Sequence, residues 1–308
     1  MKPIAVGLLG IVAASILLTG CERPKQIAEQ NIDIAGSTYQ VAPETITQTK
    51  SSFLTDGEIK IGVVSDLEGA VENAKTSAAR LKAEHVDAIV IAGDLYENEQ
   101  IRVNPSYKNS TDNVREMEKD IEPYAGLGVP VFIIPGNHES RAVYEKALTK
   151  IHKNHNNVFD INHKTADLQG INIVGLGGYH DARFIAREGF ILNDADYERA
   201  SKQLHEFQQQ KEPTVLVTHG PPKSTGSIDY VAGFGNVGDE KLAGLLGSNL
   251  QNIINVHGHI HEGGGSVAQY GNNSAVNVAS ITDYARGKGR TGGIIIIKDG
   301  NVSYQDLP

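Results

Sequence analysis

IKIGVVSDLEG, residues 59–69, joins an apolar run rich in β-branched residues to a polar turn that carries two carboxylates. Such a run is typical of a strand that is buried on both faces of its sheet. Similar runs follow at residues 87–92, 129–134, 213–218 and 252–256. The segments between the runs predict helices over residues 70–85, 112–124, 140–152, 194–210 and 239–246. This alternation predicts an α/β fold with βαβ units around a mostly parallel sheet.

Two other stretches predict antiparallel strands. Residues 158–177 contain two short strand patterns about a Gln169-Gly170 turn. Residues 266–306 contain turn signals near Asn272-Asn273 and at Lys298-Asp299-Gly300. Turns of this composition between apolar runs indicate hairpins. We therefore expect a second sheet, or antiparallel strands at the edge of the first.

Each of the five apolar runs is followed by side chains that can bind a metal ion. These residues are Asp66, Asp94, Asn137 with His138, His219, and His259 with His261. Ligands of open α/β sheets collect at the carboxyl ends of the strands, so these side chains should converge on one crevice. Taken singly, Asp66 or Asp94 could be a helix N-cap, and a lone histidine could be an ordinary buried residue. Their recurrence after five successive strands favours a metal site.

The type of ligand narrows the choice of metal. Carboxylates, an amide and imidazoles, without thiolates, suit Mn²⁺, Fe or Zn²⁺ in an open site better than a closed structural zinc site. The set is large enough for two divalent ions, and a shared carboxylate can bridge two ions about 3.5 to 4 Å apart. Such a pair of ions stabilises both the attacking and the leaving oxygen of phosphoryl transfer, so the pattern predicts hydrolysis of a phosphate ester.

Taken together, the five motifs resemble the signature of the calcineurin-like metallophosphoesterases over residues 59–261. That signature is Asp-x-His, Gly-Asp, Gly-Asn-His-Asp/Glu, a lone His and Gly-His-x-His. The resemblance implies a four-layer αββα sandwich, in which helices flank two mixed β-sheets. It also implies that Asp94 bridges the metals, that Asp66 and His261 hold the first ion, and that Asn137, His219 and His259 hold the second. His138 would stabilise the transition state or protonate the leaving oxygen.

The first motif departs from the family pattern. It reads Asp66-Leu67-Glu68, with glutamate where the family has histidine. If Glu68 coordinates the first ion, its carboxylate moves that site toward harder ions such as Mn²⁺ or Mg²⁺. If it does not, the first site is weaker or is filled only when substrate arrives. We expect Mn²⁺ as the cofactor, with Fe and Zn²⁺ as alternatives.

The expected substrate is a small phosphorylated molecule, such as a nucleotide or another phosphomonoester or phosphodiester. A hydroxide that bridges the ions would attack phosphorus, and His138 would act as general acid. The net charge of −9 argues against nucleic acid as a partner, because nucleic-acid binding relies on basic side chains. The alternative is a non-catalytic binding module on the same fold, for which Glu68 is the sequence hint.

The N-terminus has the pattern of an exported lipoprotein. Residues 1–20 contain Lys2 and an apolar run over residues 4–18, which is typical of a signal peptide. The sequence Leu18-Thr19-Gly20-Cys21 resembles a bacterial lipobox, and Cys21 is the only cysteine of the chain. We expect Cys21 to be lipidated, residues 21–56 to form a flexible tether of which Thr38 to Val41 could pack on the domain, and residues 57–308 to form an extracytoplasmic domain anchored to a membrane. An uncleaved transmembrane anchor is the alternative, although the run is short for a spanning helix.

Overall fold

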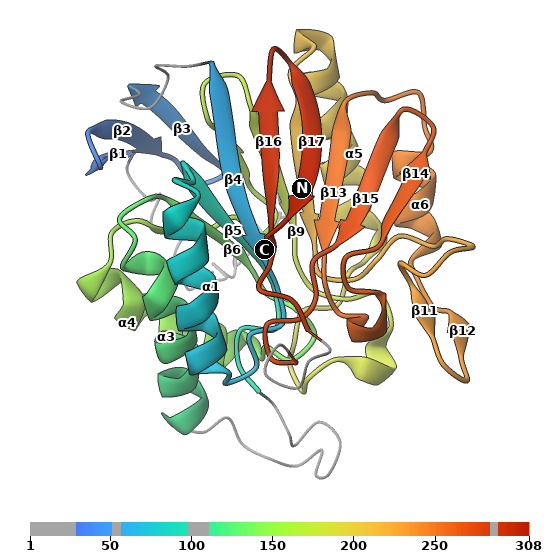
Figure 1. Ribbon diagram of the computed structural model, residues 1–308, viewed down its shortest axis with the longest axis horizontal. Coiled ribbons are helices and arrows are strands. Elements are labelled where there is room, and N and C mark those ends of the chain that lie inside the picture. Colours follow the sequence, from blue (N-terminus) through green and yellow to red (C-terminus); the bar gives the residue numbers. More distant parts are fainter. Residues whose placement is uncertain (1–28, 51–56, 98–110, 284–288, 308) are drawn as a thin grey trace, which may run out of the picture.

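Two mixed β-sheets pack face to face in the computed structural model, which describes residues 29–50, 57–97, 111–283 and 289–307 (Figure 1). The smaller sheet has six strands in the order β17-β16-β4-β5-β6-β7. Its parallel strands are β4 (Glu58–Val64), β5 (Ala88–Ala92), β6 (Val131–Ile134) and β7 (Val158–Asp160). The hairpin of β16 (Gly293–Lys298) and β17 (Asn301–Asp306) adds two antiparallel strands beside β4.

The larger sheet has nine strands in the order β1-β2-β3-β8-β9-β10-β13-β15-β14. Its parallel centre consists of β9 (Asn172–Leu176), β10 (Thr214–Thr218), β13 (Ile253–His257) and β15 (Asn273–Asn277). The antiparallel neighbours β8 (Thr165–Asp167) and β14 (Val267–Tyr270) extend it on either side. The five predicted parallel strands are present, but three of them lie in the smaller sheet and two in the larger, not in one sheet. All three predicted hairpins are also present: β14–β15 and β16–β17 lie at sheet edges, and β8–β9 lies inside the larger sheet.

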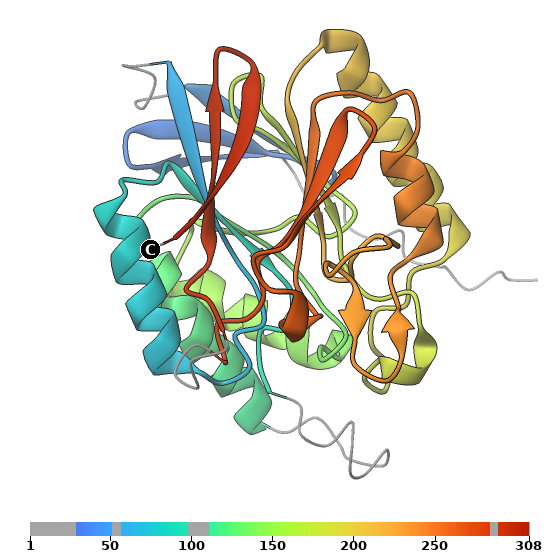
Figure 2. The same cartoon turned by 45° about the vertical axis from the view of Figure 1, so that its right-hand side comes forward.

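Helices cover the outer face of each sheet and complete four layers. The helices α1 (Val71–Ala83), α3 (Thr111–Ala125) and α4 (Arg141–Asn154) share one apolar core with the outward side chains of the six-stranded sheet. The helices α5 (Asp194–Gln210) and α6 (Glu240–Leu246) share another with the nine-stranded sheet. Figures 1 and 2 show the two helix groups on opposite sides of the molecule. The predicted αββα sandwich is confirmed.

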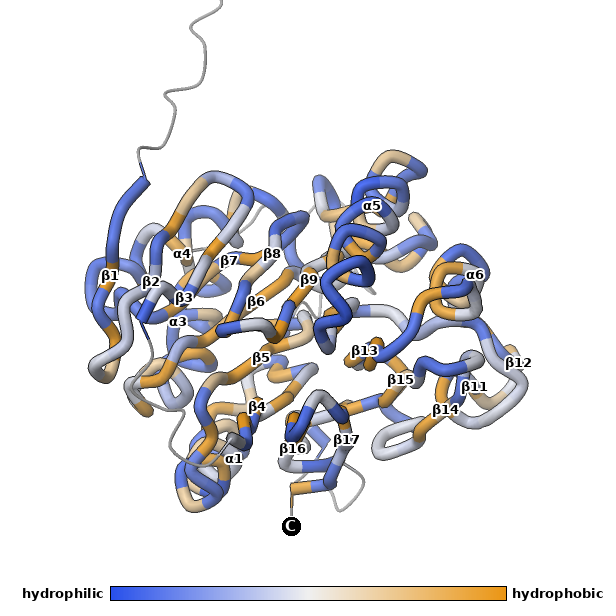
Figure 3. Tube along the Cα trace, turned by 90° about the horizontal axis from the view of Figure 1, so that it is seen from above, coloured by the Kyte–Doolittle hydropathy of each residue, from blue (hydrophilic) through white to orange (hydrophobic). Residues whose placement is uncertain are grey.

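A third apolar core fills the space between the sheets. In β4, Ile61 and Val63 face this inner core, whereas Val64 belongs to the core beneath α1. Because both faces are buried, the strand is apolar at nearly every position. Gly62 has no side chain on the α1 face, and a Cβ there would lie 2.8 Å from Leu81, so glycine lets the helix approach closely. Figure 3 shows the apolar strands between the more hydrophilic outer helices.

The expected tether is wrong for residues 30–50. These residues form β1 (Gln30–Ile34), β2 (Ser37–Val41) and β3 (Thr45–Lys50), and β3 pairs in parallel with β8. Their apolar side chains are few but buried: Ile34, Tyr39 and Ile46 are each at most 5% exposed and belong to the inner core. The polar residues alternate with these three, because only one face of the strands is buried.

The signal peptide, Cys21 and part of the expected tether fall outside the described residues. Within the described part of the chain, no helix has the length and apolar character needed to cross a bilayer.

Candidate metal centre

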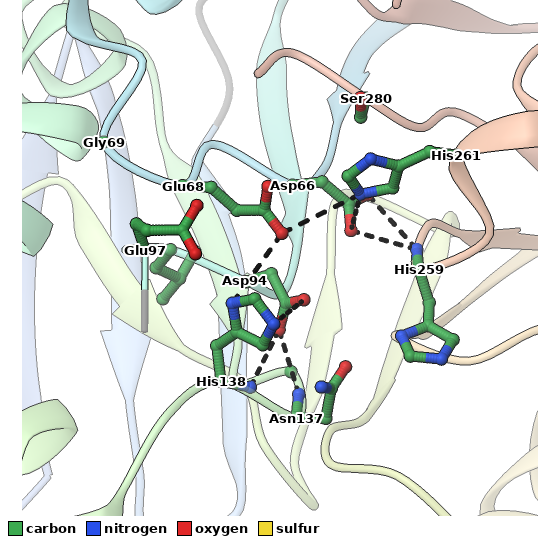
Figure 4. A network of polar contacts seen from close by, with 12 residues as sticks. Asp66, Glu68, Gly69, Asp94, Glu97, Asn137, His138, His259, His261 and Ser280 are labelled. Atoms are coloured by element: carbon green, nitrogen blue, oxygen red, sulfur yellow. Dashed lines mark hydrogen bonds and ion pairs between the residues drawn. The ribbon is translucent and has the colours of Figure 1, made fainter. Parts of the chain in front are cut away.

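The loops after five strands bring the metal-binding side chains to one place. Asp66 and Glu68 follow β4, Asp94 follows β5, and Asn137 and His138 follow β6, all in the six-stranded sheet. The nine-stranded sheet contributes His219 after β10, and His259 and His261 after β13. Figure 4 shows Asp66, Glu68, Asp94, His138, His259 and His261 gathered around a common centre, with Asn137 beside them. The convergence that the sequence predicted is therefore a feature of the structure.

Unusual backbone conformations aim these side chains. Asp66, Glu68, Asp94 and His259 have positive φ angles of 56°, 42°, 51° and 67°. Residues other than glycine rarely adopt such angles, and they persist where the surrounding structure holds them in place. Here the carbonyl oxygen of Asp94 accepts a hydrogen bond from the Leu67 amide at 2.8 Å, which ties the first loop to the second.

Asp66, Glu68 and His261 form one group of potential ligands. Nε2 of His261 lies 3.4 Å from Oδ1 of Asp66 and 3.8 Å from Oε1 of Glu68. The amide of His259 also donates to the Asp66 carboxylate, at 3.1 and 3.2 Å. Glu68, which stands where the family pattern has histidine, thus extends its carboxylate to the other members of this group.

Asp94, His219 and His259 form a second group. Nε2 of His219 lies 3.3 Å from Oδ2 of Asp94 and 2.7 Å from Oδ1 of Asn137. The other ring nitrogen of His219, Nδ1, lies 3.0 Å from the carbonyl oxygen of Ala92, which can only accept a hydrogen bond. This contact places a proton on Nδ1. Burial by itself lowers the pKa of His219, but Asp94 outweighs it and raises that pKa to about 9, so a metal ion bound at Nε2 would displace the second ring proton.

His138 lies between the two groups. Its Nδ1 is 3.7 Å from Oε1 of Glu68, and its Nε2 is 3.7 Å from Oδ2 of Asp94. The backbone amides of Asn137 and His138 donate to Oδ1 of Asp94, at 2.9 and 3.0 Å. The third potential ligand group consists of Glu68, Asp94 and His138, so Glu68 and Asp94 each belong to two groups. Two neighbouring ions could therefore share one of these carboxylates.

The electrostatics of the site fit divalent cations. Asp66 and Asp94 are almost wholly buried. The burial of Glu68 itself, together with the nearby carboxylates of Asp94 and Asp66, raises the pKa of Glu68 to about 8. Burial by itself lowers the pKa of His261, but Asp66 and Glu68 outweigh it and raise that pKa to about 10. Three converging carboxylates therefore favour positive charge in the site, and oxygen and imidazole donors suit Mn²⁺, Fe or Zn²⁺.

Glu139, which follows His138 and matches the last position of the family's Gly-Asn-His-Asp/Glu motif, has a structural role that the sequence did not predict. Its side chain is fully buried, and its two oxygens accept from the amides of Leu95 at 2.7 Å and Gly136 at 2.5 Å. Burial and the nearby Asp94 carboxylate raise the pKa of Glu139 to about 8. Glu139 thus joins the loops that carry Asp94 and His138.

Asp283 was also missed, because no motif surrounds it. Its carboxylate Oδ2 lies 2.8 Å from Nδ1 of His261, the ring nitrogen opposite the ligand atom. Of the remaining histidines near the motifs, His257 is fully buried, with Nδ1 3.2 Å from the Gly258 carbonyl oxygen. The ring of His180 lies 4.5 Å from that of Tyr179, outside the three ligand groups.

Comparison with known proteins identifies related chains. A family model described as calcineurin-like phosphoesterase matches residues 59–263. The probable glycerophosphodiester phosphodiesterase GpdQ of Arcobacter nitrofigilis is 25% identical over 198 residues, which are 64% of this chain and 64% of that protein. The chain thus spans less than two thirds of the length of this curated relative.

Solved structures with the same architecture include a dimetal phosphatase from Danio rerio, with a TM-score of 0.57 and 11% identity. The protein TT1561 of Thermus thermophilus has a TM-score of 0.55 and 14% identity. Each comparison covers 81% of this chain and 99% of the other. At such low identity, the likeness supports the fold alone.

Proposed function

This chain belongs to the calcineurin-like phosphoesterase family, and we propose that it hydrolyses phosphate esters of small molecules with two divalent metal ions. The observation that carries this proposal is that two groups of potential ligands lie side by side, one containing Glu68 and the other Asp94. A third group, formed by Glu68, Asp94 and His138, joins them. Mn²⁺ is the preferred ion in this proposal, because carboxylates contribute a large share of the ligands. Fe and Zn²⁺ are the alternatives.

The protein side chains have distinct roles in this proposal. Asp66, Glu68 and His261 would hold the first ion, Asn137, His219 and His259 would hold the second, and Asp94 would be shared. When bound, the ions supply the positive charge that stabilises a phosphoryl-transfer transition state. The chain contributes fixed geometry, because hydrogen bonds from Asn137 and His138 hold the Asp94 carboxylate in one orientation.

His138 is the proposed proton donor to the leaving oxygen. Its ring lies within 3.7 Å of both Glu68 and Asp94, and 15% of its side chain remains exposed to solvent. The ring can therefore reach a substrate at the metal centre while the two carboxylates hold it nearby. A positioned general acid of this kind typically contributes a factor of about 10² to 10⁴ to the rate.

A diester is the favoured ester class. This proposal is supported by the similarity to a probable glycerophosphodiester phosphodiesterase. The net charge of −9 supports a small substrate over a nucleic acid. The alternative of a non-catalytic module is less well supported, because its sequence hint, Glu68, lies within reach of Asp66 and His261 as a potential ligand.

Hydrolysis assays with the full chain test the proposed function. We would compare an aryl phosphodiester with an aryl phosphomonoester, each without metal and with Mn²⁺, Fe²⁺ or Zn²⁺. We expect metal-dependent turnover that is lost in Asp94→Ala and reduced at least 10²-fold in His138→Ala. His205→Ala, which removes an exposed histidine from α5, is the matched control. Two bound ions without turnover of either ester would favour the binding module.

We also propose that Cys21 carries a lipid that anchors the domain outside the cytoplasm. Residues 22–29 separate Cys21 from the first residue of β1, and a chain of this length reaches at most about 30 Å. The domain would then lie close to the membrane surface. Labelling with a radioactive fatty acid should mark the wild-type protein and leave Cys21→Ser unmarked; equal labelling would contradict the lipid anchor.

A further inference from the structure

A cavity of about 730 Å³ adjoins the metal centre and shares His259 with it. Its walls come from the segment after β9, from α5, and from residues 223–241. The ring of Tyr179 lies between the two regions, with its centroid 4.2 Å from that of His259. Cavities of roughly 300 to 1,000 Å³ are typical of sites for small organic ligands.

Two exposed aromatic rings line the cavity. Phe184 is 46% exposed and Phe234 is 78% exposed, whereas Phe132, Phe159 and Phe190 are each at most 5% exposed. A single exposed apolar side chain is ordinary, but two aromatic rings on one cavity beside a reaction centre indicate a surface for a ligand. The faces of such rings stack favourably with other planar rings.

The segments that carry these rings are held in place. A buried carboxylate, Asp229, accepts from the Gly238 amide at 2.9 Å, from the Asn236 side chain at 2.7 Å and from the Ser224 hydroxyl at 2.5 Å. These bonds brace the hairpin of β11 (Tyr230–Val231) and β12 (Gly235–Asn236), whose turn contains Phe234.

On the other segment, the carbonyl oxygen of Phe184 accepts a hydrogen bond from Nδ2 of Asn137 at 2.9 Å. Phe184 ends the short 3-10 helix η1 (Ala182–Phe184), so this bond ties η1 to a residue of the metal centre. The Phe184 segment is therefore tied to the metal centre, and the Phe234 hairpin is braced by its own hydrogen bonds, which reduces the entropic cost of binding a ligand.

The charges around the cavity favour a neutral organic group. Its cationic side chains are already engaged: Arg183 pairs with Asp181, Lys241 pairs with Asp194, and Lys223 donates to the carbonyl oxygen of Asn236. Carboxylates of Asp239, Glu240 and Glu262 also line the cavity. A second phosphate group would meet these carboxylates, whereas an uncharged planar ring meets the aromatic side chains.

We propose that this cavity binds the organic part of the substrate and selects esters that carry a planar aromatic ring, such as a nucleobase, stacked on Phe234 and Phe184. The inference rests on the proposed function for the position of the phosphate. It goes further by assigning the substrate class and two residues that determine specificity.

The kinetic test uses a matched pair of substrates, the methyl diesters of adenosine 5′-monophosphate and ribose 5-phosphate, or the parent monoesters if monoesters are preferred. The two substrates share the same phosphate ester linkage and differ in the base. We expect wild type to have a higher kcat/KM for the base-bearing ester, and the ratio to fall about tenfold in Phe234→Ala and in Phe184→Ala. Phe234→Tyr should retain the ratio.

Tyr230→Ala is the matched control, because Tyr230 is 49% exposed on the same hairpin and is not among the residues that line the cavity. It should leave the ratio unchanged. The proposal is overturned if wild type treats the two substrates alike, or if the control lowers the ratio as much as Phe234→Ala does.

A binding test separates this inference from the proposed function. Equilibrium dialysis with adenosine alone requires neither turnover nor a phosphate. We expect adenosine to bind wild type and to bind Phe234→Ala about tenfold more weakly, even if no phosphate ester is hydrolysed. Absence of adenosine binding to wild type, or equal binding to both proteins, would overturn the aromatic cavity.

Discussion

Oδ2 of Asp283 lies 2.8 Å from Nδ1 of His261, on the side of the ring opposite Asp66 and Glu68. A carboxylate at this position holds a proton on Nδ1, so that Nε2 would be the ring atom that gives up its proton to a metal ion. It also fixes the plane of the ring. Asp283 would therefore position the first ion by acting through His261.

Replacing this carboxylate should weaken the first metal site. We expect Asp283→Asn to lower the affinity for the weaker-bound Mn²⁺ by about 10- to 100-fold, while the melting temperature of the metal-free protein changes little. Isothermal titration with Mn²⁺ measures the affinity, and Asp299→Asn, in the exposed turn between β16 and β17, is the control. An unchanged Mn²⁺ affinity would rule out the positioning role.

Glu68 offers a test of metal selectivity. Glu68→His restores the family pattern and exchanges a hard oxygen ligand for a softer imidazole, so metal preference should move from Mn²⁺ toward Zn²⁺. The amounts of Mn²⁺ and Zn²⁺ bound to the protein after incubation with equal amounts of the two ions measure this change in preference. Glu97→His is the matched control, because Glu97 lies beside Glu68 in Figure 4 but belongs to none of the potential ligand groups. The same metal content in all three proteins would show that Glu68 does not coordinate.

The stability of the protein should depend on the ionisation of Asp120. This carboxylate of α3 is fully buried and accepts from the Gly69 amide at 2.7 Å. Burial, reinforced by Glu116, raises the pKa of Asp120 to about 8. An unfolded aspartate ionises near pH 3.9, so between about pH 4 and 8 the folded state binds more protons, and the free energy of unfolding falls as pH rises.

Asp120→Asn removes this ionisation and can still accept from Gly69. We expect the variant to exceed wild type in free energy of unfolding by about 1 to 3 kcal/mol at pH 8 in EDTA, and by less at pH 5. Urea unfolding at both pH values measures the difference. Asp112→Asn, at an exposed position of the same helix, should show no such pH-dependent gain. A difference that is equal at pH 5 and pH 8 would exclude Asp120 as the cause.

The strands β1–β3 should be needed for a stable domain. Ile34, Tyr39 and Ile46 each bury an apolar side chain in the inner core, and each such burial is worth about 1.5 to 3 kcal/mol. A chain that starts at Gly57 should therefore melt about 10 °C or more below one that starts at Glu29, or aggregate through the exposed edge of β8. Calorimetry of the two chains provides the measurement, and equal melting temperatures would mean that residues 29–56 are dispensable.

The local sequence was sufficient to predict the strands and helices that carry the metal-binding residues or line the cavity. The predicted strand over residues 59–64 corresponds to β4, and the predicted helix over residues 194–210 coincides with α5. These assignments succeed because apolar periodicity and turn composition depend on neighbouring residues. Residues 30–50 were misread because their three buried apolar side chains are separated by polar ones, and their partner strand β8 lies far along the chain.

The residue order alone identified the five apolar strands and the set of potential ligands, because each ligand directly follows an apolar run and ligands collect at the carboxyl ends of strands. Only the tertiary structure divided these five strands between two sheets. Only the tertiary structure decided how those ligands divide into groups, and that Glu68 extends to both Asp94 and His261. It alone placed Asp283 behind His261, and Phe184 and Phe234 on one cavity. The reason is physical: these contacts join segments distant in sequence, and packing of the two sheets, not local propensity, brings them together.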